Sequence, residues 1–195
     1  DFYEAINMAG VWALPVVFVV INNQWAISTR RSAQTAARTL AQKAIAAGFG
    51  CEQVDGNDIL AVGARVSEAL DQARSGNGPH LIEALTYRLG DHTTADDASR
   101  YRADSEVTEH WHKDPIARLR AFLIAEHNWT VADEEEVITS TLEAVKEATQ
   151  TYFDLEPEPG QAMFKHLYAR LPESMAGQLA ACLLYTSPSP RDETK

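Results

Sequence analysis

Residues 15–28 read PVVFVVINNQWAIS, in which six consecutive apolar residues, Val16 to Ile21, run directly into Asn22 and Asn23. A short apolar run without alternation is typical of a strand covered on both faces, as in parallel sheets flanked by helices. Ligands of such sheets bind beyond the carboxyl ends of the strands. Two amides at that point offer neutral oxygen ligands for a hard cation, although an Asn pair also fits an ordinary turn. The stretch therefore predicts a buried strand that ends at a polar site or in a turn.

Helical and strand patterns alternate on both sides of this stretch. The spacing of apolar residues predicts helices over 2–12, 40–47 and 59–73, and short strands over 52–55 and 80–86. This order predicts an α/β fold, with a parallel sheet flanked by helices and right-handed crossovers. The segment after the Asn pair contains Arg30, Arg31 and Arg38 and is too irregular to suggest a hairpin. We expect a loop there, either solvated or in contact with an anion.

The chain divides by composition into three parts. We expect an α/β domain over residues 1–105 and an appended C-terminal helical region over residues 106–182. Helices are expected in that region after Asp114, after Asp133 and around Met163 to Leu171. The last part, residues 183–195, is rich in Ser and Pro and is predicted to be a disordered, non-native tail.

Charge and cysteine content exclude several classes of function. The formal net charge of the 195 residues is −11 and the basic residues are scattered, which argues against nucleic acid or an anionic membrane as a partner. Cys51 and Cys182 lie far apart, so neither a disulfide framework nor a zinc site is indicated. No apolar run approaches the ~20 residues of a membrane span, and the first residues do not form a signal peptide. We therefore expect a protein of the reducing cytoplasm.

A second informative stretch is residues 87–102, YRLGDHTTADDASRYR, which follows the last expected strand. Few of its residues could build a core. If all strands are parallel, this loop leaves the sheet on the same side as the Asn pair, and its polar groups can converge on the same ligand. His92 is a candidate proton donor or acceptor because histidine titrates near neutral pH, although loop histidines are often merely solvated.

The Asn-Asn strand end and the Tyr-Arg…His-Thr-Thr-Ala-Asp-Asp loop together resemble one family. It is the alpha subunit of the thiamine-dependent decarboxylating component of 2-oxo-acid dehydrogenase complexes, and the similarity is greatest to the bacterial pyruvate type. The resemblance covers roughly residues 1–180. The family's cofactor motif opens with a Gly-Asp-Gly triplet before the position of Asp1, so the resemblance implies an N-terminally truncated chain.

The resemblance implies thiamine diphosphate and Mg²⁺ as cofactors. Asn23 would bind the metal through its side-chain oxygen and Trp25 through its backbone carbonyl, with Ala26 beside them in the cofactor site. His92 matches the active-site loop histidine, which reaches the cofactor and assists acyl transfer to the lipoyl group. Loop ordering and docking of the lipoyl domain would fall to four further residues: Arg88, Asp96, Tyr101 and Arg102.

The implied activity is oxidative decarboxylation of pyruvate with reductive acetylation of lipoyl groups on a dihydrolipoyl acyltransferase. The implied assembly is an alpha-two beta-two heterotetramer with a beta subunit. Alpha subunits of branched-chain 2-oxo-acid dehydrogenase and of acetoin dehydrogenase are close alternatives. A noncatalytic assembly fragment without a competent cofactor site is an alternative of another class. A nucleotide-binding module is a third possibility, but the sequence has no Gly-rich loop between a strand and a helix.

Overall fold

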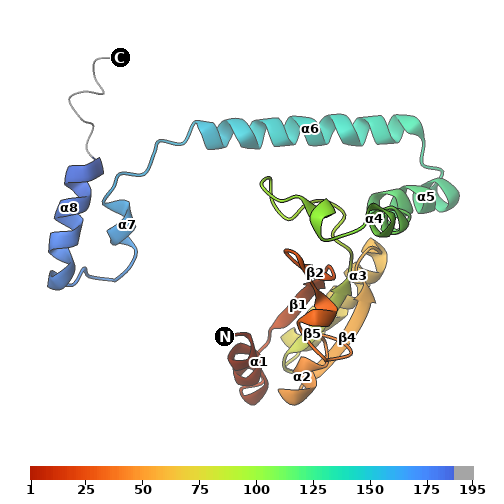
Figure 1. The fold of residues 1–195 in the computed structure, drawn as a ribbon, viewed down its shortest axis with the longest axis horizontal. Helices are drawn as coiled ribbons and strands as arrows, with labels where there is room; N and C mark the ends of the chain where they lie inside the picture. The colour runs from red at the N-terminus through yellow and green to blue at the C-terminus, as the bar shows by residue number, and fades with distance from the viewer. Residues whose placement is uncertain (187–195) are drawn as a thin grey trace. The chain divides into compact units, whose positions relative to one another are not determined.

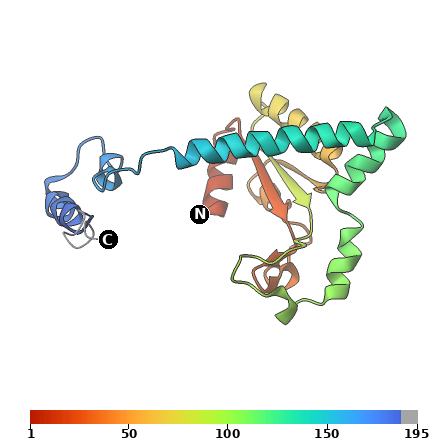
Figure 2. The same ribbon diagram turned by 90° about the horizontal axis from the view of Figure 1, so that it is seen from above.

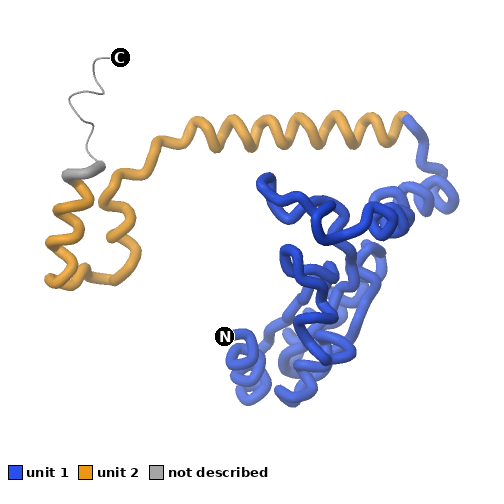
Figure 3. The backbone as a smooth tube through the Cα atoms, viewed as in Figure 1, with its two compact units in different colours: residues 1–131 blue, residues 132–195 orange. Residues whose placement is uncertain are grey.

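The computed structural model describes residues 1–186, and the chain divides between Val131 and Ala132 into two compact units (Figure 3). The domain boundary that the sequence predicts near residue 105 stays a prediction. Helices after that point stay with the first unit through ion pairs: Arg30 contacts Glu106, and Asp55 contacts Arg118. Of the described helices, none combines the length and apolar composition needed to cross a bilayer.

The first unit is built on a parallel three-stranded sheet in the order β1-β5-β4 (Figure 1). The register aligns the last residues of all three strands, Asn22, Leu85 and Asp55, at the carboxyl end of the sheet. This confirms the predicted α/β class and the convergence of the strand ends. The elements of the unit are α1 Phe2–Val11, β1 Val17–Asn22, β2 Trp25–Ala26, β3 Thr29–Arg30, α2 Lys43–Ala46, β4 Gly50–Asp55, α3 Ile59–Arg74, β5 His80–Leu85, α4 Asp104–Trp111 and α5 Pro115–His127.

Hydrophobic clusters cover both faces of the sheet. On one face Ile82 and Ala84 of β5 pack with Val54 and with Ala69 of α3. On the other face Leu81 packs with Ala41, which precedes α2, and with Ala44 of α2. Helix α1 approaches α2 closely at Gly10, where an added Cβ would lie 2.1 Å from the carbonyl oxygen of Ala47. Only glycine permits that approach.

Strand β1 departs from the prediction that both of its faces are covered. Val19 is 49% exposed and Ile21 69% exposed, whereas four consecutive residues of β5 are buried. The physical reason is position: within the described residues β1 is an edge strand and β5 is the central one. Figure 2 shows β1 and β5 side by side. A continuous apolar run therefore does not identify the central strand here.

Three local predictions also need correction. Residues after the Asn pair do form a hairpin, in which Trp25 pairs with Arg30 and Ala26 with Thr29. The helix predicted over 40–47 is regular only over Lys43–Ala46, since the preceding residues form tighter turns. The helical region predicted from residue 106 begins with α4 at Asp104, in a polar segment where the sequence predicts no individual helix.

The second unit consists of helices, as expected. They are α6 Val131–Phe153, α7 Ala162–Lys165 and α8 Ala176–Thr186. The tail predicted to be disordered from Leu183 begins inside α8, because the Ser-Pro composition starts only after Thr186. Residues 187–195 of that tail lie outside the described residues.

Candidate functional site

The candidate site begins at the turn that follows β1. Asn22 is 5% exposed, and its Oδ1 accepts a hydrogen bond from the backbone N–H of Gln24 at 3.2 Å. Asn23 Oδ1 accepts from the backbone N–H of Trp25 at 3.1 Å. Gln24, between them, has a φ of +70°, the left-handed region that non-glycine residues rarely adopt. The two amides thus hold a strained turn, a feature that clusters at functional sites.

The oxygens of this turn fit a hard cation. Mg²⁺ prefers oxygen ligands, and the side-chain oxygen of Asn23 retains a lone pair beyond the one that receives the Trp25 N–H. Nowhere in residues 1–186 do three His, Cys, Asp or Glu side chains gather as a metal cluster. The neutral donors of the turn therefore suit a metal whose charge is balanced by a phosphate ligand.

Loop 87–103 lies directly beside this turn. The backbone N–H of Thr86 donates to the carbonyl of Asn22 at 3.0 Å, and that of Arg88 donates to the carbonyl of Asn23 at 3.2 Å. The ring of Tyr101 lies 5.5 Å from the ring of Trp25, centroid to centroid. The structure therefore brings together the two stretches that carry the resemblance.

A hydrogen-bond network inside the loop joins three of the four residues expected to order it. Arg88 Nη2 donates to the Tyr101 hydroxyl at 2.8 Å, and that hydroxyl donates to Asp96 Oδ2 at 2.5 Å. The same Asp96 oxygen accepts the backbone N–H of His92 at 2.8 Å. The hydroxyl of Tyr101 and then the His92 N–H hold the pKa of Asp96 below its usual value. The imidazole of His92 is exposed at the tip of this network.

Arg102, the fourth residue, lies at the base of the loop. It is 6% exposed, and its guanidinium donates to the carbonyls of Arg88, Leu89 and Gly90. Three backbone acceptors from one segment are satisfied by one buried cation, which closes the loop on itself.

A second network attaches helix α4 to the hairpin. Arg30 Nη1 and the Tyr87 hydroxyl both donate to Glu106 Oε1, at 2.9 Å and 2.8 Å. The hydrogen bond with Arg30 lowers the pKa of Glu106 and raises that of Arg30. The ring of Tyr87 also stacks on His110, with centroids 3.7 Å apart. The sequence allowed either a solvated or an anion-contacting role for the segment that contains Arg30. In the structure Arg30 contacts an anion, the carboxylate of Glu106 in the same chain.

A hollow of about 410 Å³ lies at the carboxyl ends of β4 and β5. It adjoins the Asn turn through Gln24 and the α4 network through Tyr87 and His110. This is where ligands of parallel α/β sheets bind. Polar groups line it, among them Gln24, Gln53, Asp55, Thr86, Tyr87 and His110.

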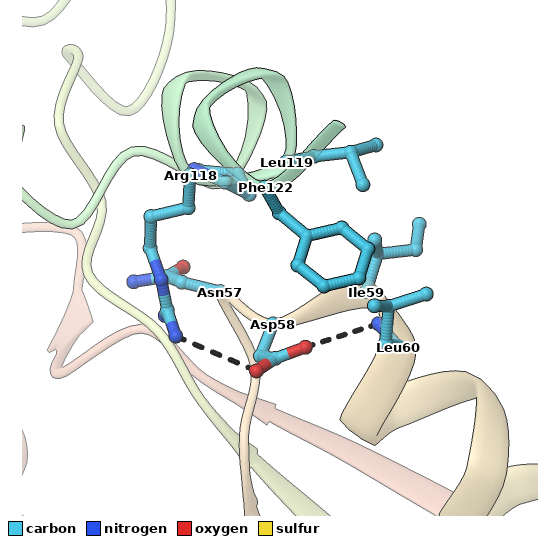
Figure 4. A pocket seen from close by; sticks show the side chains of 8 residues that line it. Asn57, Asp58, Ile59, Leu60, Arg118, Leu119 and Phe122 are labelled. Atoms are coloured by element: carbon cyan, nitrogen blue, oxygen red, sulfur yellow. Dashed lines mark hydrogen bonds and ion pairs between the residues drawn. The ribbon is translucent and has the colours of Figure 1, made fainter. Parts of the chain in front are cut away.

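A smaller hollow of about 220 Å³ lies where α5 meets the start of α3 (Figure 4). Its charged groups pair with one another. Arg118 contacts Asp55 at 2.7 Å and Asp58 at 3.5 Å, while Asp58 caps α3 through the backbone N–H of Leu60. These contacts attach α5 to the sheet. Because Arg118 and Asp58 pair with each other, neither is left as a free charge in the hollow.

Sequence reasoning missed Glu83, Tyr87, Glu106 and His110. Two of them carried a signal: Glu83 is the one charged residue in the apolar run Leu81 to Leu85, and Tyr87 is the first residue of the loop motif. The others lie on a helix whose contacts depend on the tertiary fold.

The fold and this site define a class: an α/β chain with a cation-compatible turn beside a polar loop. A family model described as "Dehydrogenase E1 component" matches residues 1–159, and the chain belongs to this family. Members of the family in general depend on thiamine diphosphate.

Two bacterial relatives share the name "Pyruvate dehydrogenase E1 component subunit alpha". The protein of Staphylococcus aureus strain Mu50 is 46% identical over 179 residues, and that of Staphylococcus epidermidis strain RP62A is 44% identical over the same number. Each match covers 91% of this chain and 48% of the relative. The chain therefore spans about half the length of the curated relatives that it matches.

Proposed function

We propose that this chain is part of the alpha subunit of a pyruvate dehydrogenase. With a beta subunit in an alpha-two beta-two heterotetramer, it would oxidatively decarboxylate pyruvate and acetylate lipoyl groups of a dihydrolipoyl acyltransferase. The observation that carries the proposal is the direct contact between the Asn turn and loop 87–103 at the carboxyl end of the sheet. A cytoplasmic location belongs to the same proposal.

In this proposal the turn holds the metal of the cofactor. The Asn23 side chain and the Trp25 carbonyl would hold Mg²⁺, and Ala26 would belong to the cofactor site. Thiamine diphosphate supplies the carbon that adds to the 2-oxo group and stabilises the charge left after decarboxylation. The buried ring of Trp25, which packs against Tyr101, would shield one side of the turn from water.

Loop 87–103 supplies the remaining roles. His92 donates or accepts a proton during acyl transfer; its residue is exposed, and its loop contacts the turn through the Arg88 N–H and the Asn23 carbonyl. Arg88, Asp96, Tyr101 and Arg102 order the loop so that it can receive the lipoyl domain. The network among them supports this role, since a flexible loop would have to lose conformational entropy on docking.

Carbon dioxide release tests the proposal. The chain is extended to the length of its relatives, co-expressed with the beta subunit, and supplied with pyruvate or branched-chain 2-oxo acids, with and without thiamine diphosphate and Mg²⁺. Cofactor-dependent turnover that favours pyruvate is expected. Preference for branched acids would assign the chain to that dehydrogenase instead. No turnover on any 2-oxo acid by a well-formed complex would point to acetoin cleavage or to a noncatalytic role.

A variant of His92 tests the role of the loop separately from that of the metal site. His92→Ala is expected to lower lipoyl acetylation by about 10²-fold or more, because a positioned acid or base contributes that much. Binding of thiamine diphosphate should persist. The exposed His112 of the same unit provides a control, and His112→Ala should retain activity. Unchanged acetylation by His92→Ala would refute the assigned role.

A further inference from the structure

Glu83 is a carboxylate at the centre of the sheet. It is 0% exposed and lies on β5, opposite Val20 of β1 and Gln53 of β4. Because side chains alternate along a strand, it shares a face with Leu81 and not with Ile82. Carboxylates are seldom buried unless their oxygens are paired.

The two oxygens of Glu83 serve different segments. Oε1 accepts from Asn22 Nδ2 at 2.6 Å, and Oε2 accepts from the backbone N–H of Ala41 at 2.9 Å. Both contacts are buried. One side chain therefore ties the end of β1 to the segment that leads into α2.

The contact with Asn22 fixes the direction of its amide. Because the nitrogen donates to Glu83, the oxygen points toward the backbone N–H of Gln24. The backbone carbonyl of Asn22 also accepts from Gln24 Nε2 at 3.3 Å. These bonds hold Gln24 at its positive φ, between the two residues whose oxygens are the proposed metal ligands.

We propose that Glu83 is a positioning residue for the Mg²⁺ site. Through Asn22 it sets the conformation of Gln24 and so the relative placement of the Asn23 side chain and the Trp25 carbonyl. The inference rests on the proposed function, since it needs a metal bound at this turn. Residues that orient metal ligands without touching the metal commonly have such an effect on affinity.

Glu83→Gln tests the inference with little change in volume. The new amide brings a donor to a place where two donors already point, at Asn22 and at Ala41. Either Asn22 turns its amide and withdraws its oxygen from Gln24, or the contact with Ala41 is lost. The measurement is Mg²⁺ affinity in the presence of thiamine diphosphate, by titration calorimetry on the extended chain complexed with its beta subunit. We expect affinity on the order of 10-fold weaker or more.

Ile82→Val is the matched control. It removes one buried methylene from the other face of the same strand and leaves the turn untouched. Its Mg²⁺ affinity should equal that of the parent. An equal loss in Ile82→Val and Glu83→Gln would overturn the inference, because loosening of the sheet alone would then explain both.

Asn22→Ala is the second variant, because it breaks the same link from the other end. Its loss of Mg²⁺ affinity should match that of Glu83→Gln. The double variant should lose little more Mg²⁺ affinity than either single variant. If Glu83→Gln does not assemble, unchanged affinity in Asn22→Ala overturns the inference. Parent affinity in Glu83→Gln overturns it while leaving the proposed function intact. A parent complex that binds neither Mg²⁺ nor thiamine diphosphate overturns the proposed function and this inference with it.

Discussion

The turn at residues 22–26 and the loop at residues 87–103 are held in place by different means. The turn is fixed from inside the sheet, by the buried carboxylate of Glu83 acting on Asn22. The loop is fixed by a network of charged and hydroxyl groups near its surface, centred on Asp96, and at its base by the buried guanidinium of Arg102. Buried contacts are little affected by salt, whereas exposed ones are screened by it. The turn is thus the rigid part of the candidate site, and the loop is the part that solution conditions can alter.

The largest expected effect comes from removing the buried anchor. Glu83→Ala leaves the Asn22 amide and the Ala41 N–H without an acceptor, and each unpaired buried donor costs about 1–3 kcal/mol. We expect the free energy of unfolding to fall by about 3 kcal/mol, measured by urea denaturation. Glu109→Ala, at an exposed position of α4, should change it by less than about 0.5 kcal/mol. An equal fall in the free energy of unfolding in both variants would contradict the claim that the buried contacts of Glu83 stabilise the protein more than an exposed residue does.

Arg102 is the buried exception within the loop. Arg102→Ala frees the carbonyls of residues 88–90, and we expect the loop to lose about 2 kcal/mol of local stability, because charge-assisted hydrogen bonds are strong. Hydrogen exchange of amides 88–102 measures this loss. The exposed Arg100 in the same loop provides the control, and Arg100→Ala should exchange like the parent. If the two variants exchange alike, the loop is not closed by its buried cation.

Tyr101→Phe is a milder change that separates the ring from the hydroxyl. The ring still packs against Trp25, but Arg88 and Asp96 lose the group that joins them. We expect a smaller loss of protection than in Arg102→Ala in the same exchange measurement, because this network is exposed to solvent. Tyr168→Phe, at an exposed position of the second unit, should have no effect on the loop. A loss as large as that of Arg102→Ala would mean that the surface network, and not the base, holds the loop.

The smallest expected effect at neutral pH is that of the ionisation of Asp96 on the exchange protection of the loop. Its pKa in the folded state is lowered by the hydrogen bonds from Tyr101 and from the His92 N–H. Its contribution is therefore complete above the ordinary aspartate pKa and is lost as the pH falls through the lowered value. Exchange protection of the His92 amide should follow that acid transition and stay constant from the ordinary aspartate pKa upward. Asp96→Asn should remove the transition, and a transition near neutral pH would contradict this assignment.

Sequence patterns predicted the strands and their common end because apolar runs and polar strand ends are local features. The run Val16 to Ile21 gave the strand correctly but not its edge position, since exposure depends on which strands lie beside it. The hairpin was missed because its two pairs are too short to show alternation. Glu83 was visible as a charge in an apolar run, but its partners come from residues 42 and 61 positions away. Contacts of that range cannot be predicted from local pattern.

The most direct test of the account is Mg²⁺ binding at Asn23. Asn23→Ala removes the proposed side-chain ligand, whereas Asn23→Asp keeps an oxygen at the same place. Titration calorimetry with thiamine diphosphate, on the extended chain complexed with its beta subunit, should show a larger loss for Asn23→Ala than for Glu83→Gln and partial recovery for Asn23→Asp. Parent-like Mg²⁺ affinity in Asn23→Ala would contradict the claim that the end of β1 is the metal-binding part of the site.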